Sequence, residues 1–120
     1  MRATDTLSLV FAALADPTRR SILTKLAEGP ATVGEVATPF AMSAPAISQH
    51  LKVLERAGLI TRTTQAQWRT LSMQAEPLDE ASAWVEKQRQ QWNRHLNALD
   101  AHIQTMKDQA VTNNSKETGS

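Results

Sequence analysis

Proline and glycine residues divide the first half of this 120-residue chain into short segments. The residues at the segment boundaries are Pro17, Gly29-Pro30, Pro39 and Gly58. Proline cannot continue a helix interior, because it lacks the backbone N–H and clashes with the preceding turn. Glycine favours the left-handed conformation that ends many helices. The spacing of these residues predicts a series of short helices joined by tight turns.

The first two predicted helices each have one apolar side. The first runs from Thr4 to about Leu14, and the second follows Asp16, an N-cap residue, with Pro17 at its first position. The second helix ends near Gly29. Their apolar residues recur at helical spacing, and are Leu7, Val10, Phe11 and Leu14 in the first helix and Ile22, Leu23 and Leu26 in the second.

Two further helices are separated by a short turn. Thr32 and Glu35 have the spacing of a capping box, in which each side chain binds a backbone N–H of the other residue. This third helix is short because Pro39 ends it. Ser43 caps a fourth helix, which reaches Ala57.

A β-hairpin and a long helix complete the predicted elements. The β-prone runs 59–63 and 68–73 are joined by a loop over 64–67 that lacks an Asn-Gly or Asp-Gly pair. A helix then begins after Pro77 and runs to about Asp108.

This order of elements is that of a winged helix-turn-helix. The predicted fold class is therefore mainly α with a small β-hairpin and a long C-terminal dimerisation helix. Residues 1–110 are expected to form one domain, with dimerisation helices at both of its ends. The polar residues 111–120 are expected to be a disordered tail.

Composition excludes several classes of function. The chain has no cysteine, which removes disulfides, thiolate metal sites and cysteine nucleophiles. The longest apolar run, 9–15, is far shorter than the roughly 20 residues of a membrane helix. No signal-peptide pattern is present, so a cytoplasmic location is expected. Residues 1–73 carry eight Lys/Arg against five Asp/Glu, a mildly basic balance compatible with a polyanionic partner.

The fourth predicted helix has two chemically different sides. On a helical wheel, Ile47, Leu51 and Leu54 form the buried stripe. The opposite side contains no carboxylate, and it is formed by Pro45, Ser48, Gln49, Lys52 and Arg56. An ordinary solvated face is the alternative interpretation, but the surrounding helix–turn–helix–hairpin order favours a DNA-binding helix.

The side chains of this outward face match groups on DNA. Gln49 can bind adenine N6 and N7, and Ser48 can bind several base edges. Lys52 and Arg56 lie further along, where they would contact phosphates. The predicted DNA-binding residues, with those of the hairpin, are Ser43, Pro45, Ser48, Gln49, Lys52, Arg56, Arg62, Gln65, Gln67 and Arg69.

The hairpin contributes a less specific signal. Arg62 and Arg69 flank its loop and would reach phosphates or a minor groove, but a merely polar turn fits the same residues. Trp68 is expected to pack rather than to stack on bases. His50, beside the buried stripe, is expected to be a half-buried structural residue rather than a DNA contact.

An apolar seam on the C-terminal helix predicts a homodimer. Its residues recur at heptad-like spacing, interrupted only at Arg89. Such a seam needs a partner, and a second copy is favoured over folding back on the same domain. The predicted dimerisation residues are Leu7, Val10, Phe11, Val85, Trp92, Leu96, Leu99, Ile103 and Met106.

Three segments resemble the ArsR/SmtB family of winged-helix repressors: AALADPTRR at 12–20, MSAPAISQHLKVL at 42–54, and AGLI at 57–60. The resemblance extends over about 5–105. It implies a homodimeric repressor that binds an imperfect palindrome near its own promoter and often releases it on ligand binding. It also implies that the first and last helices build the dimer. The hairpin departs from the family form, with no glycine and fewer basic residues.

Many members of that family bind a metal, and the corresponding positions argue against one here. Asp100 and His102 match half of a known site, but Asn113 and Lys116 replace its other two ligands. A stable zinc site needs at least three protein ligands. An intersubunit site built from His95 and His102 is the alternative. No metal and no cofactor are expected, and no motif identifies an inducing ligand.

The sequence argues against two other functional classes. An enzyme is not expected, since no catalytic Ser–His–acid motif, apolar carboxylate pair or nucleotide-binding loop is present. A winged-helix protein–protein module is the more serious alternative, because a fold alone does not imply DNA binding. Such a module would expose a hydrophobic or acidic fourth helix, unlike this one.

Overall fold

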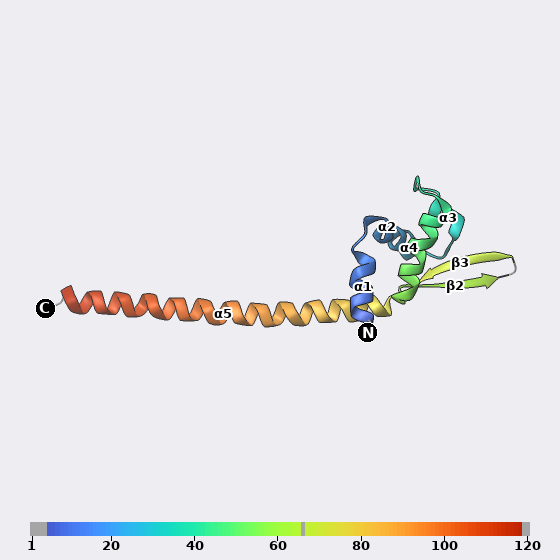
Figure 1. The fold of residues 1–120 in the computed structure, drawn as a ribbon. Coiled ribbons are helices and arrows are strands. Elements are labelled where there is room, and N and C mark those ends of the chain that lie inside the picture. The colour runs from blue at the N-terminus through green and yellow to red at the C-terminus, as the bar shows by residue number, and fades with distance from the viewer. Residues whose placement is uncertain (1–4, 66, 119–120) are drawn as a thin grey trace. The chain divides into compact units, whose positions relative to one another are not determined.

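The computed structural model describes residues 5–65 and 67–118, with the side chains of Gln65 and 112–118 outside the description. It contains five helices and three strands in these ranges (Figure 1). They are α1 (Thr6–Leu14), α2 (Pro17–Ala27), β1 (Ala31–Thr32), α3 (Val33–Ala37), α4 (Ala44–Arg56), β2 (Ile60–Gln65), β3 (Trp68–Met73) and α5 (Glu76–Thr118). In the described ranges, no helix is both long and apolar enough to cross a membrane.

The predicted N-terminal caps are present. The Asp16 carboxylate accepts from the backbone N–H of Arg19 at 3.1 Å. The Thr32 hydroxyl accepts from the N–H of Glu35, whose carboxylate in turn accepts from the N–H of Thr32. Ser43 caps α4 through the N–H of Ala46. The local signals thus placed the starts of α2, α3 and α4 correctly.

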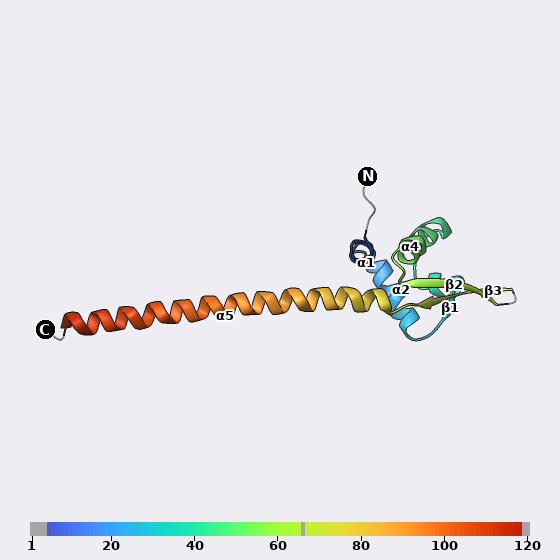
Figure 2. The ribbon, with the colours of Figure 1, turned by 90° about the horizontal axis from the view of Figure 1, so that it is seen from below.

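The strands form a three-stranded antiparallel sheet in the order β1-β3-β2 (Figure 2). The sequence predicted only the hairpin, because two-residue β1 is too short to have a periodic pattern. The hairpin is also longer than predicted. β2 continues through Gln65, which pairs with Trp68, whereas a loop was expected over 64–67. Thr63 and Thr64 are β-branched and fit a strand well.

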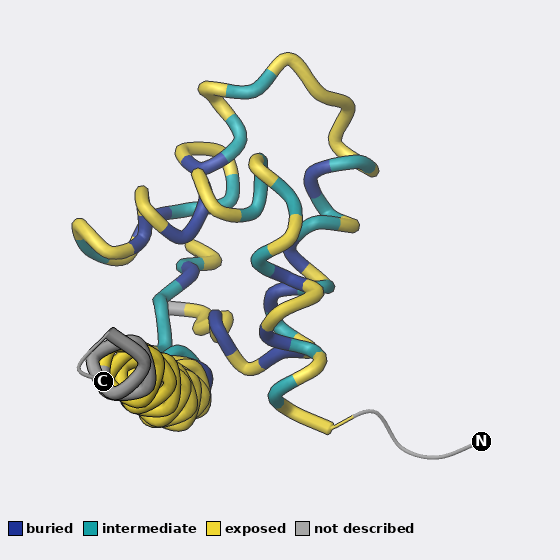
Figure 3. The backbone as a smooth tube through the Cα atoms, turned by 90° about the vertical axis from the view of Figure 1, so that its left-hand side faces the viewer, coloured by how far each residue is buried: buried dark blue, intermediate teal, exposed yellow. Residues whose placement is uncertain are grey.

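One hydrophobic core joins α1–α4, the sheet and the first turns of α5 (Figure 3). Leu51, Leu54, Leu59 and Leu71 have no exposed area. Ala81 of α5 is buried in the same core. The remaining core residues are Val10, Ala13, Ile22, Leu23, Leu26, Ala31, Val36, Ile47, Ala57 and Ile60.

The chain divides into two compact units, 1–83 and 84–120. The single domain expected over 1–110 remains a prediction. Helix α5 crosses the boundary and continues to Thr118, so its expected end near Asp108 is corrected. No proline or glycine lies between 108 and 118 to stop the helix. The backbone of 111–118 is part of α5, and the expectation of a disordered tail over 111–120 remains a prediction.

The corner between α1 and α2 is held by two arginines. Arg19 donates from Nε to the carbonyl of Ala13 at 2.7 Å and from Nη2 to that of Ala12 at 2.8 Å. Arg20 donates from Nη1 to the carbonyl of Leu14 at 2.7 Å. The last carbonyls of a helix have no partner within it. The two guanidinium groups supply these partners and fix the turn.

Replacing Arg19 with alanine is expected to lower the free energy of unfolding by about 1–3 kcal/mol, because two carbonyl groups lose charge-assisted hydrogen bonds. Urea unfolding followed by circular dichroism measures the change. Arg94→Ala is the control, since it removes an exposed arginine of α5 that makes no ion pair among the described residues. Equal losses in the two variants would contradict the role of Arg19.

Candidate nucleic-acid interface

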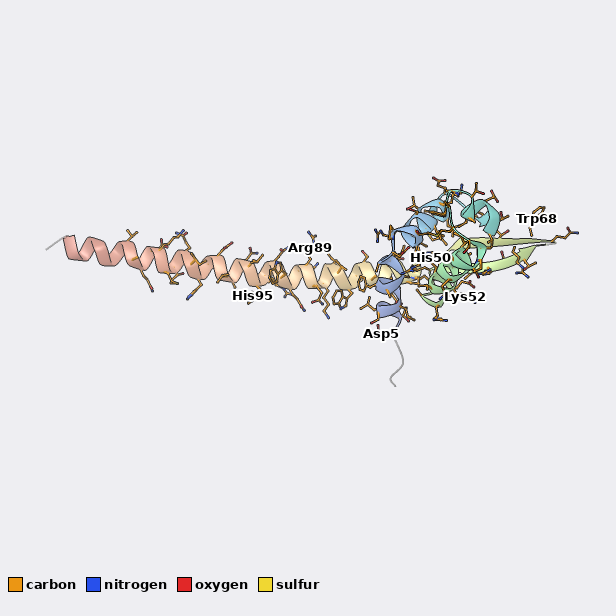
Figure 4. The ribbon with its side chains drawn as sticks, turned by 45° about the horizontal axis from the view of Figure 1, so that its top comes forward. Asp5, His50, Lys52, Trp68, Arg89 and His95 are labelled. Atoms are coloured by element: carbon orange, nitrogen blue, oxygen red, sulfur yellow. The ribbon has the colours of Figure 1, made fainter. Side chains whose placement is uncertain are left out.

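Helix α4 separates its buried and outward sides as the helical wheel predicted. Ile47, Leu51 and Leu54 are at most 2% exposed. Ser48 is partly exposed, and the other outward side chains, Pro45, Gln49, Lys52 and Arg56, are exposed. Ser43 is exposed as well, at the N-terminus of the helix. The polar side chains therefore share one accessible face (Lys52 is labelled in Figure 4).

His50 is the point where α4 is joined to the α1–α2 corner. Its side chain is 19% exposed, and Nδ1 lies 3.3 Å from Arg19 Nη1 and 3.8 Å from Asp16 Oδ2. Arginine can only donate, so Nδ1 must accept that hydrogen bond. The hydrogen bond from the backbone N–H of Arg19 holds the pKa of Asp16 below its usual value. The prediction of a half-buried structural histidine is confirmed.

The strand register gives the hairpin two different faces. Arg62 pairs with Leu71, and Thr64 pairs with Arg69. Directly opposite residues project to the same face, and so do residues two apart on one strand. Arg62 and Arg69 therefore share the face of buried Leu71, which packs on the core. The hairpin thus gathers both of its arginines on the side that lies against the helices.

Trp68 lies on the opposite face and does not pack. It is 67% exposed near the end of the hairpin (Figure 4). The expectation that it packs is wrong, because the strands extend beyond the core and leave most of the side chain exposed. Gln67 is exposed beside it, whereas the side chain of Gln65 lies outside the described part of the chain.

The apolar seam of α5 is exposed along the second unit. Val85, Trp92, Leu96, Leu99, Ile103 and Met106 are between 38% and 62% exposed. Arg89, within the seam, is paired with Glu86 through two contacts of 3.1 Å. On α1, Phe11 is exposed and Leu7 partly so, whereas Val10 has no exposed area. Val10 is therefore a core residue and does not lie on a surface that a partner could cover.

The described residues form no cluster that could hold a metal ion. Among the described residues, no three His, Cys, Asp or Glu side chains gather closely enough to hold an ion. His95 and His102 lie on α5, and the side chains at 113 and 116 fall outside the description. The expectation that the chain holds no metal remains a prediction.

One contact within the candidate interface was not predicted from the sequence. Glu55 of α4 accepts from Arg62 of β2, with Nε 2.7 Å from Oε1. Glu55 lies seven positions after Ser48, and so two helical turns along the same side. That spacing is visible in the sequence, but the angle at which the hairpin approaches α4 is not.

Comparison with known proteins identifies the family. The model of "Bacterial regulatory protein, arsR family" matches residues 16–62. The chain is 58% identical over 48 residues to the HTH-type transcriptional regulator Rv2034 of Mycobacterium tuberculosis, covering 40% of this chain and 45% of that protein. It is 38% identical over 76 residues to the transcriptional repressor SdpR of Bacillus subtilis, covering 63% of this chain and 84% of SdpR.

Solved structures give the same result. An ArsR family transcriptional regulator, RHA00566, is 42% identical, with a TM-score of 0.70 over 74% of this chain and 98% of its own. The homodimeric winged helix-turn-helix DNA-binding domain Mb0332 of Mycobacterium bovis is 26% identical, with a TM-score of 0.57. The match covers 76% of this chain and 84% of the Mb0332 chain. The predicted fold class and the resemblance are both confirmed: the chain belongs to the ArsR family of bacterial regulatory proteins.

Proposed function

We propose that the chain is a homodimeric, sequence-specific DNA-binding regulator that represses transcription from a two-fold symmetric operator. The observation that carries this proposal is the outward face of α4. It is accessible and contains hydrogen-bonding and basic side chains, and the one carboxylate at its edge, Glu55, is paired with Arg62. A helix of this kind fits the major groove.

The side chains divide into two roles. Gln49 and Ser48, in the first half of α4, are the candidates for base contacts, because their amide and hydroxyl groups match base edges. Lys52 and Arg56, further along, are the candidates for phosphate contacts. Among the described residues neither basic group has an ion-pair partner within the chain, so both charges are available to DNA.

The α5 seam supports a dimer. The row from Val85 to Met106 leaves large apolar side chains in solvent, and an apolar depression lies between Val85, Trp92 and His95. A second copy would cover this surface, and the Glu86 carboxylate already compensates the charge of Arg89. A two-fold dimer presents two copies of α4, which would read two half-sites. The homodimeric form of Mb0332 supports the same assembly.

Lys52→Ala is expected to weaken binding to every DNA sequence and to lower the salt slope of binding by about one unit, because one phosphate contact is lost. Fluorescence anisotropy with a labelled duplex of arbitrary sequence, over a series of salt concentrations, measures the slope. Lys25→Ala is the control, since Lys25 is an exposed lysine at the end of α2. An unchanged slope in Lys52→Ala would contradict a phosphate contact.

A further inference from the structure

The hairpin is tied to α4 by one ion pair. Arg62 Nε lies 2.7 Å from Glu55 Oε1, and both side chains are about one-third exposed. A guanidinium group carries five N–H donors, of which Nε has one and the two Nη groups have four. In the described part of the chain the Nη groups of Arg62 make no hydrogen bond, so the carboxylate holds the guanidinium by one edge and leaves the other free.

This pair lies beside the outward face of α4. Arg62 and Ser48 line the same small cleft, together with Val33, Ala37 and Ile47. Glu55 is on the same side of α4 as Ser48, two turns later. The free edge of the Arg62 guanidinium is therefore next to the helix side chains that would approach DNA, and not at the tip of the hairpin.

Two physical effects of Glu55 oppose each other. A carboxylate near a DNA surface repels phosphates, so its removal would strengthen binding. A carboxylate that already holds an arginine in place also lowers the conformational-entropy cost of ordering that arginine when the protein binds DNA. The direct 2.7 Å contact with Arg62 largely compensates the charge of Glu55, so the repulsion is small. A flexible arginine on an extended hairpin would lose much conformational freedom on binding DNA, so the ordering effect is the larger of the two.

We propose that Glu55 is a positioning residue of the DNA interface. It holds Arg62 by Nε so that both Nη groups are presented to a single backbone phosphate beside α4. A guanidinium fork matches a phosphate with two parallel hydrogen bonds. This inference rests on the proposed DNA binding, and it adds a residue whose own charge is of the wrong sign for DNA.

The test is a double-mutant cycle of Glu55→Ala and Arg62→Ala, with affinity measured by anisotropy on the operator at fixed salt. Glu55→Ala is expected to weaken binding about three- to tenfold, the effect of releasing one ordered side chain. In the Arg62→Ala background the same change is expected not to weaken binding, and to strengthen it modestly, because the unpaired Glu55 carboxylate then only repels phosphates. Glu28→Ala, which removes an exposed carboxylate at the end of α2, is the control and is expected to leave affinity unchanged.

Glu55→Gln separates positioning from charge. Its amide oxygen still accepts from Arg62 Nε, so we expect this variant to retain more DNA affinity than Glu55→Ala. If thermal unfolding shows that Glu55→Ala is misfolded, Glu55→Gln takes its place in the double-mutant cycle. Stronger binding by either variant, or equal weakening with and without Arg62, would overturn the inference while leaving DNA binding intact. A wild-type chain without affinity for DNA would overturn the proposed function together with it.

Discussion

Leu99→Asp is expected to convert the dimer into monomers at micromolar concentration. Leu99 is at the middle of the α5 seam, 49% exposed, with Leu96 and Ile103 on either side along the helix. A second copy would surround it with apolar side chains, and an unpaired carboxylate in such a place is strongly unfavourable. Analytical ultracentrifugation measures the change directly.

Loss of the dimer also has a consequence for DNA binding. Two linked recognition helices bind a symmetric site far more tightly than one does, so operator affinity should fall at least about a hundredfold in Leu99→Asp. Ala101→Asp is the control, because it adds the same charge to the same helix outside the seam. A dimer that survives in Leu99→Asp, or that is lost equally in Ala101→Asp, would refute the role of the seam.

Gln49→Ala is expected to lower operator affinity by about 1–3 kcal/mol and to relax the preference at one base position per half-site. Gln49 is exposed in the first half of α4, where its amide can reach a base edge. Selection from a random DNA pool with wild-type and variant proteins compares the preference at each position. Gln109→Ala, which removes an exposed glutamine of α5 outside the seam, is the control.

The outcome that would contradict this assignment is a variant that keeps the wild-type preference at every position. Uniform weakening across sequences would make Gln49 a phosphate contact instead. Because Gln49 is exposed, its replacement should leave the urea midpoint close to that of the wild-type chain.

Features of the fold that depend on local chemistry were predictable from the sequence. Caps at Asp16, Thr32 and Ser43 were visible because each cap bonds a residue three positions later. The burial of α4 followed from helical spacing alone. By contrast, β1 consists of two residues whose partners come from β3, about forty residues later in the chain, and no local signal marks such a pairing.

Parts of the candidate site depend on tertiary geometry and were not predictable. The exposure of Trp68 follows from how far the hairpin extends beyond the core, which strand propensity does not determine. Val10 belongs to the same stripe as Phe11, but only packing decides that one is buried and the other exposed. The Glu55–Arg62 pair requires the angle between α4 and β2.

Selection of duplexes from a random pool by the purified wild-type chain, at about 150 mM salt, tests the central claim most directly, because physiological screening removes much of the non-specific attraction. We expect enrichment of one two-fold symmetric site whose half-sites are about one helical turn of DNA apart, or a multiple of it. Recovery of unenriched sequence would contradict it, and would favour the winged helix as a protein-binding module.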